Sequence, residues 1–298
     1  MRRGLKIAGG AVAALVLLAG GAVFAGLQLA DARMHRKVEV PLRTVAYSRE
    51  AATVERGRYL FASRGCVDCH GANGGGRMFV DDGSSLRIRG ANITTGPGGV
   101  VAAYQPEDWV RTIRHGVAPG GRPLLIMPSE DYNRFTDADL AALVSYVRTL
   151  PPVSGEPALV QLPLPARVLY GFGAIHDAAG KIDHGLAPAQ PVAEGVNVAH
   201  GGYVANMCLG CHGAQLTGGR IPGAPPDWPA APNLTPGEGT VMGRYADADA
   251  LMRLFKSGKR ADGTAVKVMP FESLREMSET DLRALHLYLR GLQAKPHG

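Results

Sequence analysis

All four cysteines of this 298-residue chain lie in two copies of one short pattern. Residues 66–71 read CVDCHG and residues 208–213 read CLGCHG, so a Cys-x-x-Cys-His motif occurs twice with no cysteine left over. Three chemistries use a Cys-x-x-Cys pair: a zinc site, a thiol–disulfide redox centre and covalent haem attachment. The spacing of the two motifs and the residues around them decide between these chemistries.

Spacing and surroundings disfavour the first two chemistries. A zinc ribbon places its two cysteine pairs about 15 to 20 residues apart, whereas Cys66 and Cys208 are 142 residues apart. A thioredoxin-like pair follows a β-strand, and no β-branched run precedes either motif. A histidine directly after the second cysteine is the signature of c-type haem attachment. The two motifs therefore predict two covalently bound haem c groups.

In c-type attachment the two thiols form thioethers with the haem, and the adjoining histidine binds the iron as its proximal ligand. His70 and His212 are therefore the predicted proximal iron ligands. The predicted thioether residues are Cys66, Cys69, Cys208 and Cys211.

An internal repeat extends the likeness between the two motifs. RGRYLFASRGCVDCHGA around the first motif aligns with HGGYVANMCLGCHGA around the second, and ANITTG aligns with PNLTPG. Met127-Pro128 then aligns with Met269-Pro270, and the interval from the motif histidine to this methionine is 57 residues in both copies. Asn92 and its counterpart in the second copy are candidates for hydrogen bonds to the haem, although Asn and Thr before Gly are typical turn residues.

Helix signals recur at equivalent places in both copies. Capping patterns begin at Thr136 and Ser278, each ahead of an apolar stripe of helical period, so each copy is predicted to end in an amphipathic helix. A middle helix is predicted over residues 106–115 and again over 247–257, because a glycine follows each segment. A short helix over residues 57–64 leads into the first motif.

The N-terminus carries a long apolar run. Residues 7–30 hold 24 residues without a charge, more than the roughly 20 that an α-helix needs to cross a bilayer. Arg2, Arg3 and Lys6 precede the run, which keeps the N-terminus in the cytoplasm and exports the rest. The alternative is a signal peptide cleaved near residues 30–32, which would leave a soluble periplasmic protein. The run exceeds the 7 to 15 apolar residues of a typical signal peptide, which favours a retained single-pass anchor in the bacterial inner membrane.

The basic excess of the chain belongs to this N-terminal part. The formal net charge is +6, and residues 1–49 carry eight Lys/Arg against two Asp/Glu, whereas residues 50–152 carry eleven of each. Neither motif region therefore has the concentrated positive charge of a nucleic-acid-binding face. No nucleic-acid partner is expected.

Together these features resemble the class I c-type cytochromes, over residues 50–152 and again over residues 195–297. The matching features are a glycine and a tyrosine in the helix before each motif, the CxxCHG motif, a Met-Pro after a long loop and a closing helix with an aromatic residue. In that family a methionine is the second axial iron ligand, so the resemblance assigns this role to Met127 and Met269. The pair is also similar to cytochrome c subunits of membrane-bound periplasmic dehydrogenases, which carry three such domains where this chain has two.

The resulting prediction is an all-α chain with two tandem class I cytochrome c domains after a single N-terminal transmembrane helix. The domains span residues 50–152 and 195–298, after an anchor or signal segment at 1–37, and a proline-containing linker at 153–194 is expected to pack against one or both of them. His/Met ligation leaves the irons no open position, which favours electron transfer with a dehydrogenase, an oxidase or a soluble cytochrome as redox partners. The alternative is a dihaem redox enzyme such as a peroxidase, which needs an open or displaceable ligand at one haem.

Covalent attachment can be tested on the purified protein. Thioether bonds survive acid, so acid–acetone extraction should leave the haem on the polypeptide. Mass spectrometry of the intact chain should then show two added haem groups. Release of all haem into the acetone, or a mass with no added haem, would contradict the motif assignment.

Overall fold

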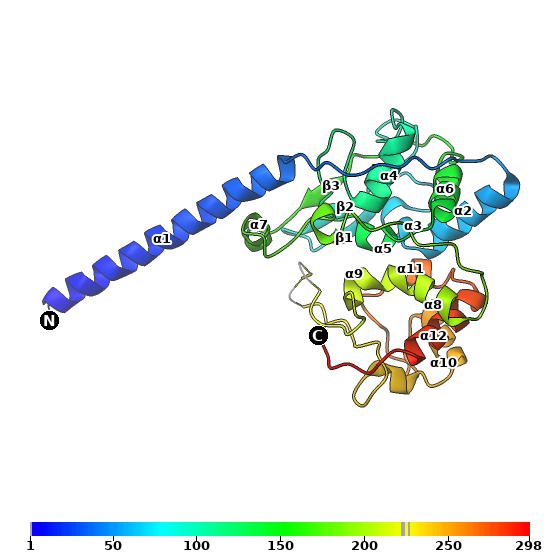
Figure 1. Ribbon diagram of the computed structural model, residues 1–298. Coiled ribbons are helices and arrows are strands. Elements are labelled where there is room, and N and C mark those ends of the chain that lie inside the picture. Colours follow the sequence, from blue (N-terminus) through cyan, green and yellow to red (C-terminus); the bar gives the residue numbers. More distant parts are fainter. Residues whose placement is uncertain (1, 222–223, 226) are drawn as a thin grey trace.

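The computed structural model describes residues 2–221, 224–225 and 227–298. A long N-terminal helix, α1 (Arg2–His35), extends away from a body made of two helical units, each with its own hydrophobic core (Figure 1). The first core is built on residues that include Leu60, Phe61, Trp109, Leu140 and Val144. The second core is built on residues that include Val204, Leu254, Met277, Leu282 and Leu285.

The two units repeat one order of helices. The first unit contains α2 (Ala51–Ser63), α3 (Cys66–His70), α4 (Pro106–His115), α5 (Ser129–Tyr132) and α6 (Asp137–Val147). The second unit contains α8 (Val198–Ala205), η2 (Asn206–Cys208), α9 (Leu209–His212), η3 (Val241–Arg244), α10 (Ala248–Ser257), α11 (Phe271–Leu274) and α12 (Glu279–Arg290). The helix that precedes each motif packs against the closing helix of its own unit, α2 on α6 and α8 on α12.

A glycine lies at each of these two helix crossings. A Cβ atom on Gly57 would come 1.9 Å from the carbonyl oxygen of Ala142, and a Cβ atom on Gly201 would come 2.0 Å from that of Ala284. Any side chain at either position would push the helices apart, so only glycine permits this approach. The aligned glycines of the repeat therefore have the same packing role.

The predicted helix caps and glycine stops are confirmed, but the helix predicted over residues 57–64 is longer, because α2 begins at Ala51 and ends at Ser63. The Thr136 hydroxyl accepts the Asp139 backbone N–H at 3.0 Å, and the Ser278 hydroxyl accepts that of Asp281 at 3.1 Å. The α4 helix spans the predicted residues, and α10 begins one residue later than predicted because Asp247 is its N-cap. Both helices end at glycines in the left-handed region, as the sequence predicted.

The prediction of an all-α chain is wrong in one respect, because a small antiparallel sheet accompanies the first unit. Its strands are β1 (Met78–Asp81), β2 (Arg87–Arg89) and β3 (Leu159–Gln161), in the order β1-β2-β3. The Asp82 carboxylate accepts backbone N–H groups of the tight turn between β1 and β2. Strands of three or four residues show too little alternation to be recognised in the sequence, and β3 lies far from its partner along the chain.

The linker packs against the first unit and against α1. Its strand β3 completes the sheet, and its helix α7 (Leu164–Gly171) lies against α1 (Figure 1). After α7, the linker forms η1 (Ala179–Lys181), and the Ala178 N–H donates to the Leu124 carbonyl at 2.8 Å. The expectation that this segment packs on the body is confirmed, and its contacts identify the first unit and α1 as the surfaces it covers.

Candidate haem-binding sites

Both Cys-x-x-Cys-His motifs form short helical turns that end at a glycine. In the first, α3 runs from Cys66 to His70 between Gly65 and Gly71, which have φ angles of +88° and +70°. Residues three apart on a helix lie on the same face, so the turn brings the two thiols of a motif together. The second motif spans η2 and α9 and ends at Gly213, with a φ angle of +77°.

A backbone carbonyl orients each motif histidine. The Nδ1 atom of His70 lies 2.8 Å from the carbonyl oxygen of Ala91, and that of His212 lies 2.9 Å from the carbonyl oxygen of Pro232. A carbonyl can only accept, so Nδ1 carries the proton and Nε2 is left free to bind a metal. Burial lowers the pKa of both imidazoles, which favours the neutral form that binds iron. Both histidines therefore fit the proximal position of a haem site.

The neighbouring Asn-x-Thr turn fixes this carbonyl. The Asn92 side-chain oxygen accepts the Thr94 N–H at 2.9 Å and its hydroxyl at 2.8 Å, while the Asn92 amide donates to the Val153 carbonyl at 2.8 Å. Because Asn92 follows Ala91 directly, the turn holds the acceptor of the His70 ring in place. These side chains act as turn residues in the structure. The second copy repeats the arrangement with Asn233, Thr235 and Lys295.

The aligned methionines occupy equivalent places in the two units. Met127 is partly buried against the first core and Met269 against the second. Each immediately precedes a proline that is the N-cap residue of a short helix, α5 or α11. Met242 and Met277, which are not aligned with each other, are fully buried in the second core as apolar packing residues.

Burial changes the chemistry of the four thiols. It raises the pKa of Cys66 and Cys208 to about 12 and that of Cys69 and Cys211 to about 11. Neutral thiols of this kind lack the depressed pKa of thioredoxin-like redox cysteines. Among the described residues, no three His, Cys, Asp or Glu side chains are grouped to hold a metal ion. Partly apolar surroundings beside an oriented histidine are what a bulky, covalently bound haem requires.

Four further histidines have partners within the chain. His200 lies 2.7 Å from Asp281, and His286 lies 2.9 Å from the carbonyl oxygen of Tyr245. The Nδ1 atoms of His115 and His184 are 3.0 Å apart. Each of these histidines therefore has at least one polar contact within the chain.

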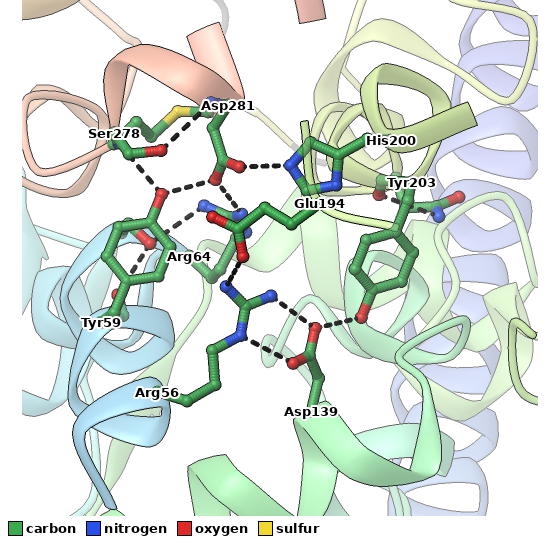
Figure 2. A network of polar contacts seen from close by, with 12 residues as sticks. Arg56, Tyr59, Arg64, Asp139, Glu194, His200, Tyr203, Ser278 and Asp281 are labelled. Carbon is green, nitrogen blue, oxygen red and sulfur yellow. Dashed lines mark hydrogen bonds and ion pairs between the residues drawn. The ribbon is translucent and has the colours of Figure 1, made fainter. Parts of the chain in front are cut away.

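Two tyrosines join the units by reciprocal hydrogen bonds (Figure 2). The Tyr59 hydroxyl of the first unit donates to the Asp281 carboxylate of the second at 2.5 Å, and the Tyr203 hydroxyl of the second donates to Asp139 of the first at 2.6 Å. Each tyrosine oxygen also accepts the backbone N–H of the N-cap residue, Ser278 or Thr136, at the start of the opposite closing helix. These tyrosines and aspartates occupy equivalent positions in the two copies of the repeat, but their pairing across the units was not predicted.

A second reciprocal contact involves the haem motifs themselves. The Asp68 carboxylate in the first motif accepts the Ser273 hydroxyl of α11, four residues after Met269. The Gly210 N–H in the second motif donates to the Asp131 carboxylate of α5, four residues after Met127, at 2.8 Å. Each motif therefore contacts the helix that follows the candidate methionine of the other unit.

The two carboxylates that accept hydrogen bonds from Tyr59 and Tyr203 differ in their surroundings. The fully buried Asp281 contacts the buried guanidinium of Arg64 and the His200 ring, whereas Asp139 binds the partly exposed Arg56 at 2.8 Å and 3.0 Å (Figure 2). Burial of Asp281 opposes its ionisation, but Arg64 and its other hydrogen-bond donors outweigh burial and hold its pKa below the ordinary value. The buried charge of Arg64 therefore depends on Asp281.

Comparison with known proteins shows what the chain is similar to. Residues 52–147 match the family model described as cytochrome C oxidase, cbb3-type, subunit III. The first helical unit is therefore similar to the c-type cytochrome domain of that family.

Individual relatives match most of the chain. It is 28% identical over 279 residues, 86% of its length, to the fructose dehydrogenase cytochrome subunit of Gluconobacter japonicus. It is 25% identical, over 85% of its length, to the cytochrome c subunit of alcohol dehydrogenase (quinone) from Gluconobacter oxydans (strain 621H). It is 28% identical, over 82% of its length, to the gluconate 2-dehydrogenase cytochrome c subunit of Pantoea cypripedii. The chain spans 56%, 57% and 60% of the lengths of these three relatives.

Replacing Asp281 with asparagine should leave Arg64 buried without its counter-charge. We expect Asp281→Asn to lower the free energy of unfolding by about 3–5 kcal/mol at pH 7. The matched variant Asp139→Asn should cost only about 1 kcal/mol, because Arg56 remains partly in contact with water. Denaturant titrations followed by circular dichroism measure both changes, and equal losses in the two variants would contradict the assignment.

The Asp281 contribution should also depend on pH with a defined sign. Its pKa is lower in the folded state than in the unfolded chain, so its stabilisation is complete above about pH 4 and is lost as the pH falls through the folded-state pKa. The difference between the wild type and Asp281→Asn should shrink over that range. Burial raises the pKa of Asp68 and Asp131, so these two groups change the stability with pH in the opposite direction. Their effect cancels in this comparison, because the wild type and Asp281→Asn both contain them.

Proposed function

We propose that the chain is a dihaem c-type cytochrome that carries electrons from a periplasmic dehydrogenase or another respiratory donor to an oxidase or a soluble cytochrome. The names of the matched relatives, which are cytochrome subunits of dehydrogenases, support this role. The chain is an electron-transfer protein, and any substrate oxidation belongs to its partner.

The residues that would hold the two haems follow from the repeated motifs. Cys66 and Cys69 would bind the first haem and Cys208 and Cys211 the second, as thioethers. The oriented Nε2 atoms of the two motif histidines would supply one axial ligand to each iron. Met127 and Met269 would supply the other ligand through their thioether sulfur atoms. When bound in this way, haem c supplies a one-electron redox centre.

The observation that carries the proposal is the reciprocal contact of the motifs with the opposite unit. Asp68 in α3 touches Ser273 in α11, and Gly210 in α9 touches Asp131 in α5. Both attachment motifs therefore border the same interface, which brings the two sites near each other within one chain (Figure 1). This arrangement suits electron transfer between the two sites without a mobile carrier.

Helix α1 would anchor the protein in the bacterial inner membrane, with the haem-bearing units in the periplasm. Among the described residues, it is the one helix long and apolar enough to cross a membrane. Its C-terminal part is built into the fold, since a Cβ atom on Gly171 of α7 would come 1.9 Å from the Gly26 carbonyl oxygen. Signal cleavage near residues 30–32 would remove this contact. The packing therefore favours retention of the anchor over a soluble periplasmic form.

A dihaem peroxidase is the second candidate function. Such an enzyme needs an open or displaceable ligand position at one haem. Here both units carry a methionine at the equivalent position, partly buried against the core of its own unit. The two units thus offer the same set of candidate ligands, which favours the carrier.

Histidine substitutions test the methionine ligands. Thioether ligation raises the reduction potential, so Met127→His and Met269→His should each lower the potential of one haem by on the order of 0.1 V and leave the other nearly unchanged. Met78→His, at a methionine without an aligned partner, serves as the control and should change neither potential. A redox titration followed by absorbance measures these values. Unchanged titrations in both ligand variants would contradict the assignment.

Ligand binding to the reduced protein separates the carrier from the enzyme. If the methionines close both irons, carbon monoxide must first displace a bound thioether. The reduced spectrum should then be low-spin, change little with carbon monoxide, and be accompanied by negligible peroxide turnover. Reduced protein should pass electrons to a soluble cytochrome or an oxidase. Stoichiometric carbon monoxide binding at one haem, together with catalytic consumption of peroxide, would instead establish the enzyme.

A further inference from the structure

The linker helix α7 crosses the C-terminal part of α1 at very close range. A Cβ atom on Gly171 would lie 1.9 Å from the Gly26 carbonyl oxygen and 3.0 Å from the Ala30 nitrogen. A Cβ atom on Gly26 would lie 2.8 Å from Cγ1 of Val168 and 3.0 Å from Cε2 of Phe172. Small residues thus bring the two backbones into contact and fix α7 at the level of residues 26–30.

This level corresponds to the outer boundary of a membrane crossed by α1. At a rise of 1.5 Å per residue, about 20 residues cover the roughly 30 Å hydrocarbon core. Counted from the first uncharged position, residues 7–26 fill that thickness. Asp31 then begins a charged segment outside it that also contains Arg33, Arg36 and Lys37. The crossing with α7 therefore lies where the hydrocarbon core meets the lipid headgroups.

The α7 segment exposes large apolar side chains at this level. Leu164, Leu169 and Phe172 are 52%, 48% and 53% exposed. At 100° per residue, Leu164 and Phe172 lie on the same side of the helix as Gly171 and Val168, which contact α1. On α1 itself, Phe24 and Leu29 are also exposed. The apolar side of α7 thus continues the exposed apolar surface of α1.

Polar contacts hold α7 and α1 to the first unit. The Arg36 guanidinium donates to the buried Asp177 carboxylate at 2.9 Å, and the Tyr170 hydroxyl donates to the same carboxylate at 2.8 Å. The next residue, Ala178, donates its N–H to the Leu124 carbonyl of the first unit. Helix α1, helix α7 and the first unit are therefore joined at one place, and the orientation of α7 is tied to that of the body.

We propose that α7 is an interfacial membrane helix whose apolar side chains insert into the outer leaflet of the bilayer that α1 spans. Amphipathic helices bind at this depth, with apolar side chains below the headgroups and basic side chains beside the lipid phosphates. The exposed Arg167 supplies such a basic group. Insertion at α7, in addition to the span, would fix the orientation of the haem-bearing units relative to the membrane. The inference rests on the proposed role of α1 as a retained span.

Spin labels can report the depth of α7 in the full-length haem protein. Single cysteines would replace Leu169 or Phe172, with Leu15→Cys in α1 as the membrane control and the exposed Leu186→Cys as the aqueous control. The labelled proteins are reconstituted in phosphatidylethanolamine–phosphatidylglycerol vesicles, and the haem absorbance confirms that each is folded. Power-saturation measurements should show several-fold greater access to oxygen than to a water-soluble nickel complex at Leu15, Leu169 and Phe172, and the reverse at Leu186.

The outcomes distinguish the two proposals. A label in lipid at Leu15 with aqueous labels at Leu169 and Phe172 would overturn the α7 inference and leave the anchor in place. Aqueous labels at all three positions would overturn both. Labels that leave water only when a dehydrogenase subunit is added would mark α7 as a protein-docking surface, which also overturns the inference.

A second measurement requires no substitution. The wild-type protein in vesicles that contain a photoactivatable acyl chain should acquire lipid adducts on residues 164–172 as well as on residues 7–26. Adducts on residues 7–26 without any on residues 164–172 would contradict the interfacial position of α7.

Discussion

The rest of the structure depends on two reciprocal hydrogen bonds that Tyr59 and Tyr203 donate across the two units. Tyr59 and Tyr203 each donate to the third residue of the opposite closing helix. This residue is an aspartate, and its negative charge interacts favourably with the positive end of the helix dipole. The same contact thus stabilises a helix start and joins two cores. Because these two hydrogen bonds are reciprocal, the units meet as the two halves of an isologous dimer do, although they belong to one chain. This relation also brings both CxxCH motifs to the shared interface.

The repeat is not perfect, and one difference in length makes the interface electrostatically unequal. The first copy has two more residues between its tyrosine and its first cysteine than the second copy. Arg64 lies in this longer stretch, and its buried guanidinium reaches Asp281, which His200 also contacts. The corresponding aspartate, Asp139, binds the partly exposed Arg56 (Figure 2). The two candidate haem sites therefore have different electrostatic surroundings even though their motifs match, and burial and nearby charge are factors that influence the potential of a haem.

The features that the sequence predicted are local, and the features it missed join distant segments. Thr136 and Ser278 cap their helices, and Gly116 ends α4, because each signal lies within a few residues of the helix end it specifies. The acceptors of the motif histidines are backbone carbonyls, which no side-chain pattern reveals. The pairing of Tyr59 with Asp281 depends on the placement of two units, and the position of β3 depends on where the linker crosses the first unit. Alignment of the two copies showed that the tyrosines and aspartates recur at equivalent positions, but it could not show which tyrosine contacts which aspartate.

The linker restrains the body relative to α1, the proposed membrane anchor. A flexible tether would let the two units sample many distances from the membrane, whereas this segment forms a strand of the sheet, a helix against α1 and an ion pair between Asp177 and Arg36. Each contact removes freedom that a mobile carrier would use to reach separate partners. The hydrogen bonds of Tyr59 and Tyr203 then hold the second unit to the first. For the electron-transfer role proposed above, these restraints suit a relay at a fixed place better than a protein that shuttles between partners.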